Sequence, residues 1–212
     1  MKLRKEFITK TKEQRLYQVP CPVLGLTGGI ATGKSSVSNL FQENGIDVIC
    51  ADKLVKIVYQ EPETIDFITH HFPQAVSEGA INFKKLREIA FSDRKHKLKL
   101  EQFIYQKLPL AFKEEFNKLV EPRVLVYDVP LLFEKSMQDL FDLTICVYAK
   151  REIQIKRIIK RDNSTTDLAE KILENQIPID EKKKLSDYCI ENNGSVDELK
   201  QKFESMVAQL LE

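Results

Sequence analysis

The 212-residue sequence has no tryptophan, only four cysteines, no long apolar run and almost no net charge. Because no segment approaches the roughly 18 apolar residues of a membrane span, we expect no transmembrane helix. A net charge of +1 provides no global field to attract nucleic acid or a membrane surface, so we expect neither as a partner. The cysteines are too far apart in sequence for a zinc knuckle or a redox pair. They are Cys21, Cys50, Cys146 and Cys189. We therefore expect buried, reduced thiols, as is typical of a cytoplasmic protein.

The length suits one domain with room for an inserted lid. Residues 1–16 carry six Lys or Arg and two Glu, and they lack the apolar segment of a secretory signal. We interpret residues 1–20 as an N-terminal extension, solvated or loosely packed, and residues 21–212 as the folded domain. No heptad pattern or large apolar patch can be assigned, which favours a monomer.

Short apolar runs alternate with helix-length patterns along the chain. The runs cover residues 22–27, 47–50, 123–129, 143–148 and 188–190. The helical patterns cover residues 34–44, 52–59, 63–71, 83–91, 93–119, 150–160, 167–175 and 195–211. Strands that alternate with helices predict an α/β fold with a parallel sheet covered on both faces.

Residues 28–35 read Gly-Gly-Ile-Ala-Thr-Gly-Lys-Ser, which fits the P-loop pattern G-x-x-x-x-G-K-[ST]. The stretch 23–27 before it is typical of a short buried strand, and the stretch 36–41 after it is typical of the first turns of a helix. This strand–loop–helix context is the one in which the motif binds phosphate. The alternative, a glycine-rich turn with an exposed lysine, does not account for the flanking elements.

Each part of the P-loop has a physical role. Its glycines let backbone N–H groups turn toward phosphate oxygens, and the following helix directs its positive dipole end at the same place. Lys34 can reach the β- and γ-phosphates, and the Ser35 hydroxyl can ligate Mg²⁺. The sequence therefore predicts a site for ATP and Mg²⁺. The predicted nucleotide-binding residues in the loop are Gly29, Ile30, Ala31, Thr32, Gly33, Lys34, Ser35 and Ser36.

Asp52 follows the second apolar run. Ligands of an open α/β sheet bind outside the carboxyl ends of its strands, so this position is a candidate for chemistry. Phosphoryl transfer to an alcohol needs a carboxylate that orients the hydroxyl group and accepts its proton. An aspartate here would also cap the helix that follows, and the two roles are compatible.

Asp128 ends the third apolar run. An apolar strand closed by aspartate resembles a Walker-B element, which holds Mg²⁺ directly or through water. The alternative is a simple turn residue, since aspartate is common after strands. The P-loop elsewhere in the chain favours the metal interpretation.

The segment 150–161 predicts a basic helix after the fourth apolar run. Arg157 and Arg161 are four residues apart and share one face of it. Beside a phosphate site, arginines of a lid would neutralise the transferred phosphoryl group. The alternative is a solvated charged face. That is our interpretation of the lysines at 182–184, with Lys182 as the candidate exception.

These residues together resemble the dephospho-coenzyme A kinase family, over nearly everything after the N-terminal extension. The matching stretches are residues 26–30, 33–35, 45–49, 51–52, 86–87 with Phe91, 128–134, Arg157 with 161–162, Gln176 with Pro178 and 181–182, and Asp187 with 193–194. The Val-Pro-Leu-Leu-Phe-Glu stretch at 129–134 and the Gln-x-Pro-x-x-Glu-Lys stretch at 176–182 are not general P-loop features. They distinguish this family from other small-molecule kinases.

The resemblance implies a three-layer P-loop fold with a five-stranded parallel sheet, a helical acceptor-binding region at about 55–120 and a lid at about 150–180. It implies transfer of the γ-phosphoryl group of ATP to the ribose 3′-hydroxyl of dephospho-coenzyme A. It also implies roles for individual residues. Lys34, Asp52 and Arg157 would be catalytic, Arg161, Asn193 and Gly194 would bind the nucleotide, Ser35 and Asp128 would hold the metal, and Asp52, Lys56, Arg87, Leu131 and Glu134 would contact the acceptor.

The sequence departs from the family pattern on the acceptor side. Cys50 stands where aspartate is common, Lys56 where arginine is usual, and Tyr105-Gln106 where a His-Pro pair is usual. A lysine lacks the planar bidentate fork of arginine. Two alternatives therefore stay open: a P-loop kinase of another nucleotide or nucleoside, and a nucleotide-sensing protein without catalysis.

Overall fold

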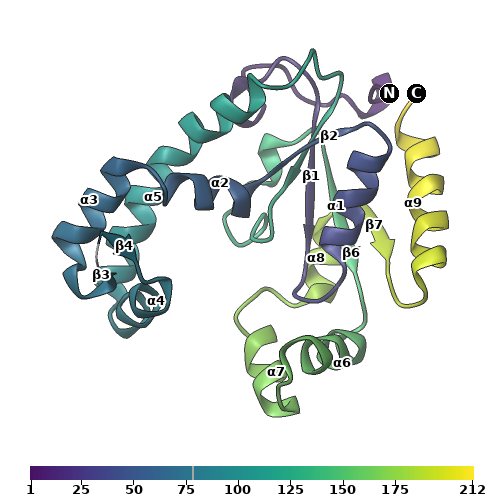
Figure 1. The fold of residues 1–212 in the computed structure, drawn as a ribbon. Coiled ribbons are helices and arrows are strands. Elements are labelled where there is room, and N and C mark those ends of the chain that lie inside the picture. Colours follow the sequence, from purple (N-terminus) through teal and green to yellow (C-terminus); the bar gives the residue numbers. More distant parts are fainter. Residues whose placement is uncertain (78) are drawn as a thin grey trace. The chain divides into compact units, whose positions relative to one another are not determined.

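The computed structural model describes residues 1–77 and 79–212, without the side chain of Phe91 (Figure 1). The chain forms two compact units. The sheet unit comprises Met1–Cys50 and Leu119–Glu212, and the helical unit comprises Ala51–Lys118. The helical unit nearly coincides with the region at about 55–120 that was predicted to be helical, and its role in binding an acceptor stays a prediction.

The sheet unit is built on a five-stranded parallel sheet with the strand order β2-β5-β1-β6-β7. The strands are β1 (Val23–Gly28), β2 (Asp47–Cys50), β5 (Leu125–Asp128), β6 (Leu143–Tyr148) and β7 (Tyr188–Glu191). All residues of β1 are buried, as expected for a central strand with helices on both sides. Each predicted apolar run overlaps one of these strands, and the predicted α/β fold class is confirmed.

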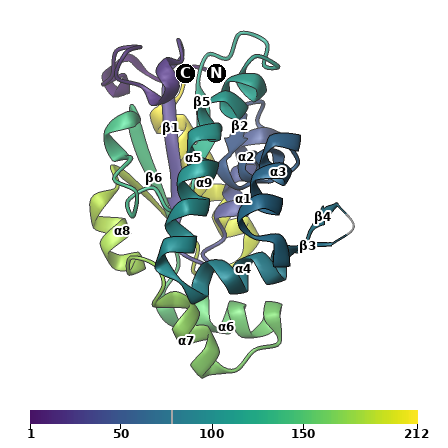
Figure 2. The same cartoon turned by 90° about the vertical axis from the view of Figure 1, so that its left-hand side faces the viewer.

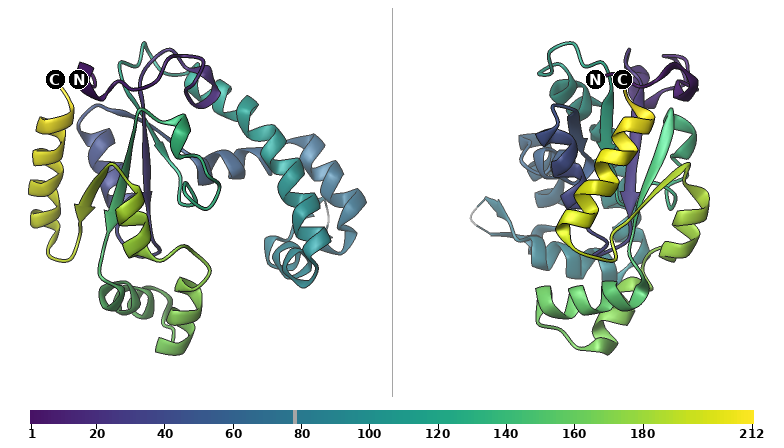
Figure 3. Two further views of the ribbon diagram at one scale, coloured as in Figure 1. Left: turned by 180° about the vertical axis from the view of Figure 1, so that it is seen from behind. Right: turned by 90° about the vertical axis from the view of Figure 1, so that its right-hand side faces the viewer.

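Helices of the sheet unit cover both faces of the sheet (Figure 3). The sheet unit contains the 3-10 helices η1 (Lys5–Phe7), η2 (Leu16–Gln18) and η4 (Gln138–Leu140), and the α-helices α1 (Lys34–Glu43), α6 (Arg151–Asp162), α7 (Thr166–Leu173), α8 (Ile179–Leu185) and α9 (Val196–Leu210). On one face, α1 and α9 pack together, with the rings of Phe41 and Phe203 edge to face at 4.9 Å. On the other face, a Cβ at Gly25 would come within 2.8 Å of both Leu132 and Phe141, so only glycine fits.

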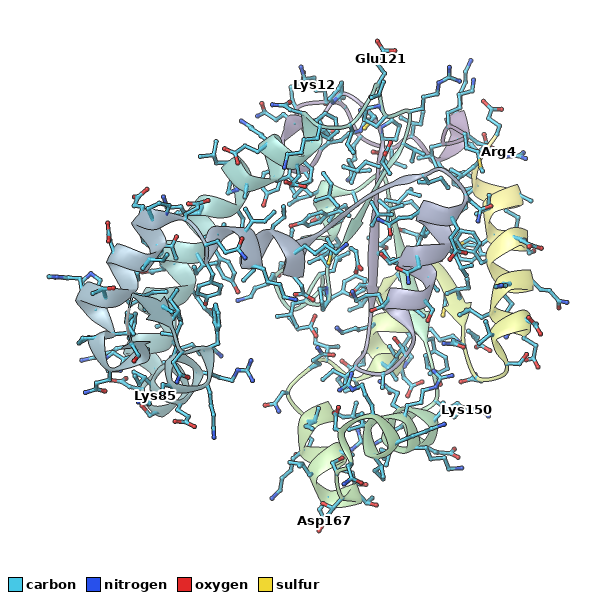
Figure 4. The ribbon with its side chains drawn as sticks, in the orientation of Figure 1. Arg4, Lys12, Lys85, Glu121, Lys150 and Asp167 are labelled. Carbon is cyan, nitrogen blue, oxygen red and sulfur yellow. The ribbon has the colours of Figure 1, made fainter. Side chains whose placement is uncertain are left out.

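Two helices lie beside the carboxyl end of β6. Figure 2 shows α6 and α7 next to each other, and Figure 4 labels Lys150 directly before α6 and Asp167 within α7. Their shared core contains Ile158, Ala169 and Leu173, and the P-loop residues Ile30 and Ala31 pack against it. This region corresponds to the predicted lid, whose movement stays a prediction.

The helical unit contains α2 (Ala51–Val58), α3 (Pro62–His71), α4 (Phe83–Ser92) and α5 (Arg94–Phe116), with the short helix η3 (Pro73–Ala75) and a two-stranded hairpin of β3 (Val76–Ser77) and β4 (Ala80–Ile81). Phe67 on α3 stacks on Phe103 of α5 with 3.8 Å between ring centroids. Phe72 packs against Phe67, and Phe112 of α5 is also buried. None of the described helices is long and apolar enough to span a membrane.

The N-terminal segment is packed, so the prediction of a solvated or loosely packed extension is wrong. Leu3 and Leu16 are buried, and Leu3 forms an antiparallel bridge with Leu211. The two termini therefore lie side by side, and the Arg4 side chain, labelled in Figure 4, donates to the carbonyl oxygen of Ala208 at 2.9 Å. The apolar residues of the N-terminal segment are scattered among charged residues and show no regular period, so the sequence did not predict this contact.

A buried ion pair anchors the same segment. Arg15 Nε and Nη2 donate to the two carboxylate oxygens of Asp142 at 2.7 and 3.2 Å. The backbone N–H groups of Lys10 and Val23 donate to the same carboxylate at 3.0 and 2.9 Å. Asp142 thus joins the N-terminal segment to the start of β1 and to the residue before β6.

We expect Asp142→Ala to lower the free energy of unfolding by about 3 kcal/mol, because it leaves the Arg15 guanidinium buried without its partner. Urea-induced unfolding would measure the change. The control is Asp139→Ala in η4, where the side chain is exposed and the expected change is below about 0.5 kcal/mol. Equal stabilities of the two variants would contradict this role of the ion pair.

The fold brings together two cysteines that are 43 residues apart (189 minus 146). Cys146 on β6 and Cys189 on β7 are partners in the strand register, and both thiols are free. The neighbouring Cys189 thiol, together with burial, raises the pKa of Cys146, and interaction with the Cys146 thiol lowers the pKa of Cys189. Burial also raises the pKa of Cys21 to about 11. Sequence spacing did not predict the proximity of Cys146 and Cys189.

Candidate active site

The P-loop connects β1 to α1, with Lys34 as the first helical residue. Gly33 adopts φ +95°, a left-handed conformation that favours glycine. Over the described residues, the backbone N–H groups of Ile30, Ala31, Gly33, Lys34 and Ser35 have no hydrogen-bond acceptor. Unpaired N–H groups around the start of a helix form a site for an anion.

Lys34 forms an ion pair with Asp128. Asp128 is the last residue of β5, in register with Leu26 of β1 and Cys50 of β2, and it is only 3 % exposed. Because β1 and β5 are adjacent and parallel, the P-loop after β1 and the last residue of β5 lie at the same carboxyl end of the sheet. Lys34 and Asp128 therefore meet there. A bound triphosphate would offer Lys34 another set of anionic oxygens.

The oxygen atoms next to this lysine fit a magnesium ion. Ser35 is exposed in the first turn of α1, and Asp128 supplies a carboxylate. Magnesium keeps several waters and needs only one or two protein oxygens when it also binds phosphates. The described residues contain no group of three or more His, Cys, Asp or Glu that could hold a metal alone, and a site of this kind does not require one.

The two arginines of α6 differ in their surroundings. Arg157 is half-buried, and its Nη1 donates to the carbonyl oxygens of Ala31 and Thr32 at 3.2 and 3.3 Å. Arg161 is exposed and forms two hydrogen bonds of 2.7 Å with Asp162, whose pKa it lowers. Arg157 and Arg161 were predicted to share one face of the helix. In this structure only Arg157 contacts the P-loop.

Gln154 and Asn192 also contact the P-loop. Gln154 Nε2 donates to the carbonyl oxygen of Ile30 at 2.6 Å, and Asn192 Nδ2 donates to that of Thr32 at 2.8 Å. Neither residue was predicted from the sequence to be part of the site. The position of Gln154, one helical turn before Arg157, was the available signal for it. For Asn192 the signal was its place just after the last strand.

Asn193 and Gly194 follow β7 near the start of α6. The Asn193 side chain accepts a hydrogen bond from the backbone N–H of Lys150 at 2.9 Å. Gly194 lies against Glu198, whose Oε2 would be 1.9 Å from a Cβ at this position. Their predicted place near the adenine ring stays a prediction.

Lys182 is fully buried, so it is an exception to the solvated face predicted for residues 182–184, as the sequence analysis allowed. Its Nζ pairs with Glu134 Oε1 at 2.7 Å and donates to the carbonyl oxygen of Pro130 at 2.9 Å. The carbonyl oxygen of Gly28, at the end of β1, is 3.5 Å away. Lys182 therefore ties α8 to the first glycine of the P-loop and to the segment after β5.

The 129–134 stretch supplies two predicted acceptor residues. Leu131 is half-buried, and Glu134 is engaged by Lys182 and by the backbone N–H of Ile177 at 3.1 Å. Glu134 Oε2 is buried and has no partner over the described residues. Glu134 thus links the segment after β5 to Lys182 and Ile177. Its contact with an acceptor stays a prediction.

The remaining predicted acceptor residues lie in the helical unit. Asp52 is the second residue of α2, so it stands in the first helical turn rather than at the N-cap. Its side chain is exposed and makes no hydrogen bond or ion pair over the described residues. Lys56 is also exposed on α2.

Arg87 borders a cavity of about 300 Å³ within the helical unit. The wall is mainly apolar and aromatic, which is typical of pockets for small molecules. It consists of Val55, Tyr59, Phe83, Leu86, Arg87, Ala90, Lys97, Leu100, Glu101, Ile104 and Tyr105. Tyr105, one of the departures from the family pattern, is therefore part of this wall.

Comparison with known proteins identifies the family. The family model described as dephospho-CoA kinase (CoaE) matches residues 22–198. The dephospho-CoA kinase of Fusobacterium nucleatum is 37% identical over 184 residues, covering 86% of this chain and 95% of that protein. That of Clostridium tetani is 35% identical over 211 residues, covering 96% and 90%.

Solved structures agree with these relatives. The fold is similar to that of dephospho-CoA kinase from Campylobacter jejuni, with a TM-score of 0.66, 27% identity and coverage of 88% of this chain and 96% of that one. It is also similar to TT1252 from Thermus thermophilus, with a TM-score of 0.81, 28% identity and coverage of 91% and 99%. Because the family match extends from the first strand of the sheet into its last helix, the chain belongs to the dephospho-CoA kinase family of P-loop kinases, which use ATP to convert dephospho-CoA to CoA.

Proposed function

We propose that this kinase binds the ATP triphosphate on residues 28–35 and passes the γ-phosphoryl group to the ribose 3′-hydroxyl of dephospho-CoA. Binding of the ATP triphosphate at this loop is supported by its unpaired backbone N–H groups, which lie beside the Lys34 side chain. Preorganised donors stabilise the charge of a transferring phosphoryl group without further rearrangement. Asn193 and Gly194 are proposed to lie near the adenine ring.

Ser35 and Asp128 are the proposed protein ligands of Mg²⁺. When bound, this ion neutralises charge on the phosphate oxygens. The hydroxyl of Ser35 and the carboxylate of Asp128 would orient it, and Lys34 would move from Asp128 to the phosphates.

Asp52 is the proposed general base. It would orient the acceptor hydroxyl and take its proton as the oxygen attacks phosphorus. Its exposed carboxylate, with no competing partner over the described residues, supports this role. Lys56, Arg87, Leu131 and Glu134 are also proposed to contact the acceptor.

The arginines of α6 are proposed to stabilise the charge of the transition state. Arg157 already brings a guanidinium to the P-loop, and Arg161 is one turn further along the helix. Arginine suits this task because its charge persists and its planar fork matches phosphate oxygens.

The test is ADP release from ATP and Mg²⁺ with dephospho-CoA, AMP, CMP, adenosine or no acceptor. We expect strong release only with dephospho-CoA, despite the changes at Cys50, Lys56 and Tyr105. Faster turnover of a nucleoside monophosphate would contradict the proposed acceptor. Nucleotide binding without turnover of any acceptor would instead indicate a nucleotide sensor.

A further inference from the structure

Three successive carbonyl groups of the P-loop accept hydrogen bonds from side chains outside it. Ile30 O accepts from Gln154 at 2.6 Å, Ala31 O from Arg157 at 3.2 Å, and Thr32 O from Asn192 at 2.8 Å. The donors come from α6 and from the residue after β7. We call these three side chains the carbonyl clamp.

The clamp is built of largely buried groups. Gln154 is 2 % exposed and Asn192 is 7 % exposed. Arg157 Nη2 also donates to the carbonyl oxygen of Asn192 at 3.0 Å, which links two of the three side chains. Because buried amides must be paired to offset their desolvation, these contacts strongly favour one arrangement of the loop.

The planarity of the peptide bond connects the clamp to the anion site. In a trans peptide, the C=O of one residue and the N–H of the next point in opposite directions. Holding Ile30 O and Thr32 O on the clamp side therefore directs the N–H groups of Ala31 and Gly33 to the opposite side. Those N–H groups are among the ones without an acceptor over the described residues.

The glycines of the loop fit the clamp closely. A Cβ at Gly29 would be 2.6 Å from Gln154 Nε2, and a Cβ at Gly33 would be 2.1 Å from Asn192 Nδ2. Contacts this short exclude a side chain at either position while the amides stay in place. Gln154 and Asn192 therefore occupy the space that the missing side chains leave.

We propose that Gln154 and Asn192 are positioning residues, which hold the P-loop carbonyls so that its N–H groups face the ATP triphosphate. The proposal rests on the proposed function, because it assumes that the triphosphate binds at residues 28–35. The two amides hold carbonyl groups of the loop, so they act through preorganisation. Their loss lets the loop turn its carbonyls toward the phosphates, which weakens binding of the triphosphate.

The experiment compares Gln154→Leu, which removes the donor at similar size, with the wild-type enzyme. We expect the KM for ATP to rise about 10-fold while the KM for dephospho-CoA stays unchanged. Binding of inorganic tripolyphosphate, measured by calorimetry, should weaken by a similar factor, whereas binding of adenosine should not change. Asn192→Ala should show the same pattern.

Thr144→Val is the matched control. Thr144 is buried near the start of β6, and its hydroxyl donates to Asp187 at 2.7 Å, so its loss lowers stability without touching the P-loop. We expect a lower melting temperature and an unchanged KM for ATP in this variant. If Gln154→Leu does not fold, Gln154→Glu keeps the side-chain size and replaces the donor with a carboxylate, and it should raise the KM for ATP as well.

Two results separate failure of the clamp from failure of the proposed function. An unchanged KM for ATP and unchanged tripolyphosphate binding in folded Gln154 and Asn192 variants would overturn the clamp, with the proposed function intact. A wild-type enzyme that binds no tripolyphosphate would overturn the assignment of the triphosphate to residues 28–35, and with it the clamp. An equal rise of the KM for ATP in Thr144→Val would show a merely structural role.

Discussion

Lys34→Ala is expected to lower turnover by about 10²–10³-fold or more at saturating ATP. Lys34 carries the one positive charge of residues 28–35, and we propose that it contacts the β- and γ-phosphates. Its contribution grows as charge develops on the transferring group, so kcat should fall more than ATP affinity. Steady-state kinetics with dephospho-CoA, together with ATP binding by calorimetry, would measure both quantities.

The same substitution removes the ion-pair partner of Asp128, which is 3 % exposed. A buried carboxylate without a partner lowers stability, so thermal unfolding of the variant has to be measured beside its kinetics. Adding Asp128→Asn should recover stability without recovering turnover. Lys200→Ala on α9, where the lysine is exposed, is the control and should keep wild-type activity. Turnover of Lys34→Ala within tenfold of wild type would contradict the role of Lys34.

Asp52→Asn is expected to lower kcat by roughly 10²–10⁴-fold and to leave ATP affinity nearly unchanged. Asparagine keeps the size of the side chain and can still accept a hydrogen bond, but it does not take up the proton of the acceptor hydroxyl. Because Asp52 is exposed and unpaired over the described residues, we expect little change in stability. The loss should therefore appear in kcat, measured by ADP release with dephospho-CoA.

The control for Asp52 is Asp66→Asn on α3, another exposed aspartate of the helical unit. It should keep wild-type kinetics. If Asp52→Asn also kept wild-type turnover, Asp52 would serve only the first turn of α2, where a carboxylate interacts favourably with the helix dipole. A loss of ATP affinity without a loss of kcat would likewise exclude the role of base.

Local pattern was sufficient for most elements of the fold. The apolar run at 143–148 coincides with β6, because a doubly covered parallel strand must be continuously apolar. The run at 47–50 coincides with the edge strand β2. The P-loop was recognisable because its glycines and Lys34 are adjacent in the chain. The helix α8 was not predicted, since its seven residues include three consecutive lysines and show no amphipathic period.

What the sequence by itself determined is the alternation of the five sheet strands with most of the helices, the P-loop and, through family-specific stretches, the reaction. Only the tertiary structure decided that Lys182 is buried on Glu134, that Arg15 is anchored by Asp142, and that Gln154 and Asn192 hold the P-loop carbonyls. These contacts join residues far apart in the chain. The burial that makes each polar group depend on its partner exists only after the chain has folded, so no local periodicity encodes it.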